Sequence, residues 1–234
     1  MRLLAVLPIG LIAAGGFVLA APPLLVDGLE RVSPEVVFSA SVDRKVVALT
    51  IDDGPSDQTG EILQALEESG ARATFFLIGS RMKRRPDVVW RIVDAGHEIG
   101  NHTMEETASI LLDPDEFAHQ LRETDSLLSG YADPRWFRPG SGWYDRSMLD
   151  EARGAGYRIV LASMWPIDSY LPWTPIVAEY VRRQARPGAI LVVHDGPGRG
   201  ARTAATLRRV LPELRRQGYE VTTVGDLLGR AEGS

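Results

Sequence analysis

Residues 46–55, VVALTIDDGP, decide the fold. The run Val46–Ile51 is apolar and rich in β-branched residues, which predicts a strand buried on both faces. Gly54-Pro55 predicts a turn at its end. A turn accounts for the Gly-Pro pair and one aspartate, but not for two neighbouring carboxylates, Asp52 and Asp53. We therefore expect this strand end to face a functional site.

The rest of the chain alternates apolar runs with amphipathic patterns, which predicts a parallel sheet covered by helices. Seven strands without a glycine-rich phosphate loop favour a closed barrel over an open doubly wound sheet. The further strands are expected at 73–78, 97–100, 135–138, 157–162, 189–193 and 219–223. The helices are expected at 59–69, 86–95, 115–129, 146–154, 175–185 and 202–217.

Composition excludes several classes of function. The 234 residues carry a net charge of −5, and the arginines are scattered along helical stretches, so we expect no nucleic-acid binding. The chain has no cysteine, which excludes disulfides, thiolate nucleophiles and cysteine-bound metals.

The N-terminus predicts export. One arginine precedes an uncharged stretch that lasts until Asp27. The stretch suits a signal peptide, with small residues around Ala20 for cleavage, or a membrane anchor through residues 3–26. We expect 1–26 to be this segment, 27–44 a linker or lead-in and 45–234 the catalytic domain. The domain would then be secreted, periplasmic or held at the outer face of the cytoplasmic membrane.

Polar side chains follow the predicted strands at their carboxyl ends, which is where (β/α) barrels have their active sites. Neighbouring strand residues point to opposite faces, so Asp52 and Asp53 converge only if Gly54-Pro55 turns the chain. We predict different roles for them, one binding a metal and the other accepting a proton. The groups are Asp52-Asp53, His102, Arg138, Asp168 and His194-Asp195.

A metal site is predicted around His102. Glu106 is four residues further on, and the two side chains share a face if HTMEET opens a helical turn. With Asp53 they would provide three ligands and leave positions for water, as catalytic metal sites do.

Five ordered motifs now point to a family. They are ALTIDDGP, ATFFLIGS, GHEIGNHT, WFRPGSGWY and GAILVVHDG. Together they resemble the NodB-like polysaccharide deacetylases, carbohydrate esterase family 4, from about Lys45 to Leu228. The resemblance implies a distorted (β/α)7 barrel of the α/β class. It also implies metal-dependent removal of acetyl groups from sugars such as N-acetylglucosamine, so that the partner is an N-acetylated glycan.

The resemblance assigns roles to the strand-end residues. Asp52 resembles the catalytic base and Arg138 the residue that holds it. Asp53 and His102 resemble metal ligands. His194 resembles the general acid, and Asp168 the aspartate that orients it.

The loop after the fourth strand is RPGSG where the family usually has RPPYG. Ser141 N–H remains able to hold an oxyanion, because this donor needs no particular side chain. Trp143 and Tyr144 would either stack on a sugar ring or pack the barrel mouth.

A second departure is Glu106, which stands where the family usually has a second histidine. A carboxylate also ligates zinc, and the more anionic site shifts the preference towards harder ions. We expect one divalent ion, zinc first, with cobalt or manganese as alternatives. Two other functions stay open: an inactive barrel that binds glycans, and a glycosidase with paired carboxylates. Of the remaining histidines, His97 is expected to shape its loop and His119 to be exposed.

Overall fold

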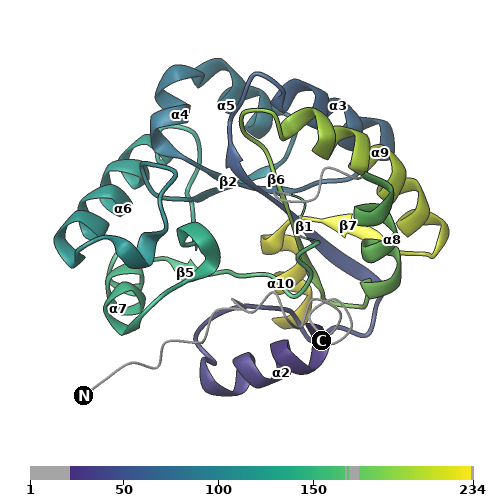
Figure 1. Ribbon diagram of the computed structural model, residues 1–234, viewed down its shortest axis with the longest axis horizontal. Helices are drawn as coiled ribbons and strands as arrows, with labels where there is room; N and C mark the ends of the chain where they lie inside the picture. Colours follow the sequence, from purple (N-terminus) through teal and green to yellow (C-terminus); the bar gives the residue numbers. More distant parts are fainter. Residues whose placement is uncertain (1–21, 167, 169–173, 233–234) are drawn as a thin grey trace.

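The computed structural model describes residues 22–166, 168 and 174–232. Parallel strands form the centre of the molecule and helices surround them (Figure 1). The strands are β1 Val46–Gly54, β2 Thr74–Leu77, β3 Glu98–Asn101, β4 Trp136–Phe137, β5 Arg158–Ile159, β6 Ile190–His194 and β7 Glu220–Thr222. The helices are α2 Pro22–Val32, α3 Thr59–Ser69, α4 Gly79–Arg84, α5 Pro86–Asp94, α6 Pro114–Leu128, α7 Arg146–Gly154, α8 Thr174–Gln184, α9 Gly200–Arg216 and α10 Val224–Glu232.

The sheet runs in the order β5-β4-β3-β2-β1-β6, and β7 pairs with the first residues of β1. Every ladder is parallel. A bridge between Met164 and Leu191 joins the segment after β5 to β6, which brings the two ends of the sheet together. The predicted α/β class and the distorted (β/α)7 barrel are confirmed.

Alternation along β1 separates the two faces of the sheet. Val47, Leu49 and Ile51 belong to the cluster that packs under the helices. Val46 and Ala48 belong to a different cluster inside the barrel. Because the side-chain period of a strand is two residues, Thr50 and Asp52 also point inward.

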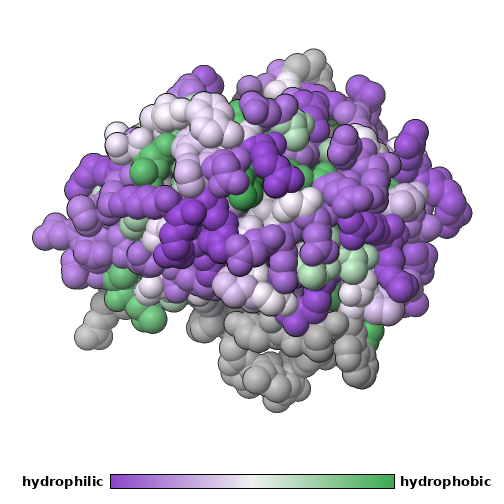
Figure 2. Space-filling model, turned by 90° about the horizontal axis from the view of Figure 1, so that it is seen from above, coloured by the Kyte–Doolittle hydropathy of each residue, from purple (hydrophilic) through white to green (hydrophobic). Residues whose placement is uncertain are grey.

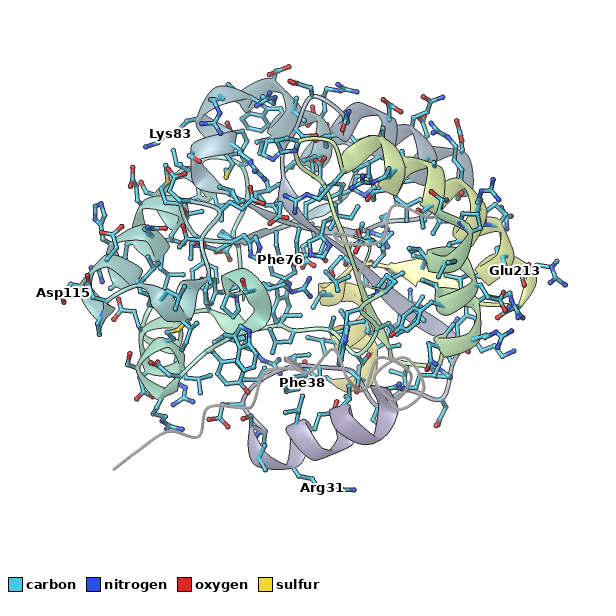
Figure 3. All side chains as sticks on the ribbon, viewed as in Figure 1. Arg31, Phe38, Phe76, Lys83, Asp115 and Glu213 are labelled. Atoms are coloured by element: carbon cyan, nitrogen blue, oxygen red, sulfur yellow. The ribbon has the colours of Figure 1, made fainter. Side chains whose placement is uncertain are left out.

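The segment before β1, predicted as a linker or lead-in at 27–44, is packed onto the barrel. Phe38 is 2% exposed and lies between α2 and the strands (Figure 3). Val37 N–H donates to the carbonyl of Ile159 at 2.9 Å. The predicted leader falls mainly on residues 1–21, outside the described residues, and none of the described helices is long and apolar enough to cross a membrane.

Helix α10 covers the end of the barrel at which the strands begin, opposite their carboxyl ends. Val224 and Leu227 are fully buried in the interior cluster beside Val46, at the amino end of β1. The outer helices turn their polar faces to water, and Figure 2 shows a surface dominated by hydrophilic residues with small, separate hydrophobic areas. The helices therefore leave the carboxyl ends of the strands as the place for a site.

Candidate active site

The two-residue alternation places two of the predicted side chains, Asp52 and His194, on the inner face at the carboxyl end of the barrel. Asp52 and His194 are paired neighbours on β1 and β6. Phe76 points into the centre of the barrel (Figure 3), and its ring centroid lies 4.2 Å from the Arg138 guanidinium carbon. A side chain at Gly100 would come within 2.8 Å of the Phe76 ring. Glycine at this position therefore makes room for the floor of the site.

Asp52 and Arg138 form a buried ion pair. Arg138 Nη1 lies 2.7 Å from Asp52 Oδ1 and also donates to Thr50 Oγ1 at 2.6 Å. Its Nε and Nη2 donate to the carbonyls of Val160 and Leu161, each at 2.9 Å. Charge-assisted hydrogen bonds of this kind are among the strongest in proteins. Arg138 is thus fixed on all sides and orients the Asp52 carboxylate, the arrangement expected of a held base.

Asp53 reaches the site because the backbone is left-handed at this residue. Its φ is 68°, and the pairing of β1 with β2 is irregular between Asp52 and Gly54. Alternation along β1 would point the Asp53 side chain outward, but this backbone conformation turns it into the site. Asp53 Oδ1 lies 3.3 Å from His102 Nε2. The two aspartates converge without the predicted turn at Gly54-Pro55, since the strand continues to Gly54 and the change of direction occurs at Asp53 itself.

His102 is held so that Nε2 faces Asp53. Its Nδ1 lies 2.6 Å from the carbonyl oxygen of Arg138, which accepts the Nδ1 proton. Burial alone would raise the pKa of Asp53, but the hydrogen bond from His102 and the charges of His102, His194 and Arg199 lower it to about 2. An ionised carboxylate and an oriented imidazole nitrogen are a suitable donor pair for a divalent cation.

Glu106 does not join this pair. The residues after β3 form bends rather than a helical turn, so the predicted shared face of His102 and Glu106 is wrong. The Glu106 side chain is 45% exposed and forms ion pairs with Arg81 and Arg199. Within the described part of the chain, no three His, Asp or Glu side chains converge closely enough to hold a metal. Two of the three predicted ligands are together and the third is held by arginines.

The predicted acid side is assembled from two segments. Asp168 Oδ1 lies 2.9 Å from His194 Nδ1, and Asp168 Oδ2 accepts the His194 backbone N–H at 2.9 Å. Burial alone would lower the pKa of His194, but the Asp168 hydrogen bond and the charges of Asp168, Asp52 and Asp53 raise it to about 9. The imidazole is therefore protonated at neutral pH and can donate from Nε2.

Asp195, next to His194, has a structural role. It is fully buried, and its two oxygens accept hydrogen bonds from Ser56 Oγ and Thr59 Oγ1, each at 2.5 Å. It thereby ties the end of β6 to the loop after β1 rather than entering the ring of site residues.

The loop after β4 only partly matches its prediction. Ser141 is exposed, with φ 65°, in the short 3-10 turn Gly140–Gly142. Trp143 is partly exposed. Tyr144 is 6% exposed and packs in the cluster with Phe117 and Phe137, so its burial favours the packing alternative over stacking on a sugar ring.

Arg81 and Arg199 were not predicted. Arg81 is buried, and one of its nitrogens donates to the carbonyl of Asp53 while another contacts Glu106. Both arginines occur in stretches that have the composition of solvated loops and helix faces, and their partners are 25 or more residues away in sequence. No local pattern marks such contacts.

Comparison with known proteins agrees with the geometry. The family model described as polysaccharide deacetylase matches residues 39–160. A peptidoglycan-N-acetylglucosamine deacetylase of Bacillus cereus is 34% identical over 198 residues, covering 82% of this chain and 92% of that relative.

Two solved structures are also similar. One is a peptidoglycan N-acetylglucosamine deacetylase, with a TM-score of 0.80, 29% identity and coverage of 86% of this chain and 96% of the other. The second is described as a carbohydrate esterase family 4 pseudoenzyme from Bacillus anthracis, with a TM-score of 0.78, 29% identity and coverage of 86% and 72%. The chain belongs to the polysaccharide deacetylase family.

Proposed function

We propose that this protein hydrolyses N-acetyl groups of an N-acetylglucosamine-containing polysaccharide or oligosaccharide, with a divalent metal and outside the cytoplasm. One observation carries the proposal: three carboxylates, each paired with an arginine or a histidine, meet at one end of the barrel. The pairs are Asp52–Arg138, Asp53–His102 and His194–Asp168. The glycan follows from the substrates named for the similar enzymes.

The two residues that handle protons have different hydrogen-bond partners, and amide hydrolysis needs one acceptor and one donor. Asp52 is an acceptor oriented by Arg138, and it takes a proton from the attacking water. Water oxygen bonds to the acetyl carbon, and the carbon–nitrogen bond to the sugar breaks as His194 protonates the nitrogen. Acetate and a sugar amine are the products. Asp168 keeps His194 charged and correctly turned.

Asp53 and His102 are the residues that would hold the metal, and Glu106 would join them only after leaving its arginines. A divalent ion, when bound, polarises the acetyl carbonyl and lowers the pKa of a water molecule. We infer zinc first, with cobalt or manganese as alternatives. The backbone N–H of Ser141 is the proposed protein donor to the developing oxyanion.

A second function has a specific observation in its favour. Glu106 is engaged by Arg81 and Arg199, and one similar structure is described as a pseudoenzyme. An inactive barrel that binds glycans therefore remains the rival. A glycosidase is disfavoured, because Asp52 and Asp53 are committed to Arg138 and His102.

Acetate release tests these alternatives. The purified chain is incubated with N-acetylglucosamine oligomers or peptidoglycan, as prepared, with a chelator, and after zinc, cobalt or manganese is added back. We expect acetate that disappears with chelator and returns with metal, and no new reducing ends. Glycan binding without acetate would establish the rival, and new reducing ends would indicate a glycosidase.

A further inference from the structure

Arg199 lies between two carboxylates that were both expected to bind the metal. Its Nη2 is 3.2 Å from Asp53 Oδ2 and 2.5 Å from Glu106 Oε1. The Arg199 side chain is only 20% exposed. A single organic cation thus joins one member of the Asp53–His102 pair to the third expected ligand.

The local backbone is shaped for this arrangement. The N–H of Arg199 donates to the carbonyl of Gly196 at 3.0 Å, in the turn that leads into α9. Gly196 has φ 109°, and a side chain there would meet Arg199 Nη2 at 2.9 Å and Arg81 Nη1 at 3.1 Å. The glycine therefore allows two guanidinium groups to pack side by side against the main chain.

Charge is balanced in this part of the site. Three carboxylates are paired with three guanidinium groups, which leaves no net charge among the six. Adding a divalent cation while all three arginines stay would create an excess of two positive charges in a partly buried region, which is unfavourable. If Arg199 leaves, the excess falls to one and a carboxylate oxygen is freed on both Asp53 and Glu106. The pairs are Asp52–Arg138, Asp53–Arg199, Glu106–Arg199 and Glu106–Arg81.

We propose that Arg199 is a built-in competitor of the metal: its guanidinium occupies Asp53 and Glu106, and a divalent ion binds only by displacing it. The inference rests on the proposed function, because it takes Asp53 and His102 as metal ligands. It makes the metal affinity of this chain lower than its ligands alone would provide. The position of Arg199, rather than the identity of Glu106, then sets how much metal is needed for activity.

Zinc affinity measured by isothermal titration calorimetry on the chelator-treated full chain tests this inference. Arg199→Met removes the cation but retains an unbranched side chain. We expect its dissociation constant for zinc to be roughly 10- to 100-fold lower than that of the parent, the size of one charge-assisted contact. Arg199→Lys keeps the charge without the forked geometry, and its affinity should fall between the two.

Arg202→Met is the matched control. Arg202 lies in the first turn of α9, and among the described residues it forms no ion pair with Asp53 or Glu106. The control removes the same charge close by, so it reports the general electrostatic effect. Thermal melting of each variant in chelator confirms that it is folded before titration.

The outcomes separate the inference from the proposed function. Tighter zinc binding by Arg199→Met than by Arg202→Met supports competition, even if the parent shows no detectable binding. Unchanged or weaker binding overturns it, and so does the absence of binding in every folded variant. Acetate release is measured separately: tighter binding without acetate in any variant would refute the deacetylase and leave the competition intact.

Discussion

His97 should make the stability of the protein depend on pH. The side chain is 9% exposed, its Nδ1 accepts the backbone N–H of Ala73 at 3.3 Å, and its ring centroid lies 5.4 Å from that of Phe75. Burial first, and then the positive charge of Arg72, lower the pKa of His97 from 6.5 to about 4. The native imidazole is therefore neutral over a range in which the unfolded one is charged.

The sign follows from proton binding. Between pH 4 and 6.5 the unfolded chain holds a proton on His97 that the folded chain does not, so unfolding becomes easier as the pH falls. At about 1.4 kcal/mol for each tenfold change in proton affinity, the full effect is roughly 3 to 4 kcal/mol. That is a large part of the 5–15 kcal/mol typical of a folded domain.

Urea unfolding, followed by tryptophan fluorescence at several pH values from 4.5 to 7.5, measures the effect. His97→Gln retains an oxygen acceptor for Ala73 N–H but cannot titrate. Its unfolding free energy should fall less steeply with acid than that of the parent, and the difference between the two profiles isolates His97. His119→Gln is the control, because the His119 side chain is 68% exposed. Parallel profiles for the parent and His97→Gln would refute the reasoning.

Three further predictions concern the site and the packed N-terminal segment. Asp52→Asn should bind zinc as the parent does but lose roughly 10²- to 10⁴-fold in turnover. Asp53→Asn should instead bind zinc more weakly and regain activity in excess metal. If the two variants behave equally in zinc titration and acetate release, the division of roles is contradicted. Asp168→Asn should lower the pKa of His194 from about 9, so that activity is lost at a lower pH as the solution becomes alkaline; an unshifted alkaline limb of kcat/KM would remove Asp168 from this role. Phe38→Ala should lower the free energy of unfolding by about 3–5 kcal/mol, and urea unfolding with no change in midpoint would show that the segment before β1 is dispensable.

The sequence was informative wherever structure follows from a local period. The helices at 59–69 and 146–154 have the predicted bounds, because their apolar spacing and flanking residues are complete within the segment. β4 and β5 are shorter than their apolar runs, because a strand extends only as far as its neighbours pair with it. Among the described residues, three α-helices were missed: α2, which resembled part of an export segment, and the short α4 and α10.

The same contrast between local patterns and contacts of distant segments applies to the site residues. The position of Asp52, Arg138 and His194 at the carboxyl ends of predicted strands was enough to expect them close together, and the structure has Asp52 beside both others. The expected contact of His102 with Glu106 failed because it required a helical turn, and Thr103 instead has φ 63°. The Thr103 N–H donates to Asn101 Oδ1 at 2.9 Å, which stabilises this non-helical backbone conformation.

The closure of the barrel, where the segment after β5 meets β6, leaves Asp168 with less mechanical support than Asp52 and Asp53. Asp52 and Asp53 belong to the nine-residue β1, which is bonded to neighbours on both sides. Asp168 follows Met164, in the segment after the two-residue β5. Met164 is joined to β6 by the single Met164–Leu191 bridge, with two backbone hydrogen bonds of 3.0 Å. Regions with few backbone hydrogen bonds open before the core does. An early opening event would therefore separate Asp168 from His194 while Asp52 and Asp53 stay in place. Hydrogen exchange would then show the segment around Met164 as the least protected part of the barrel closure.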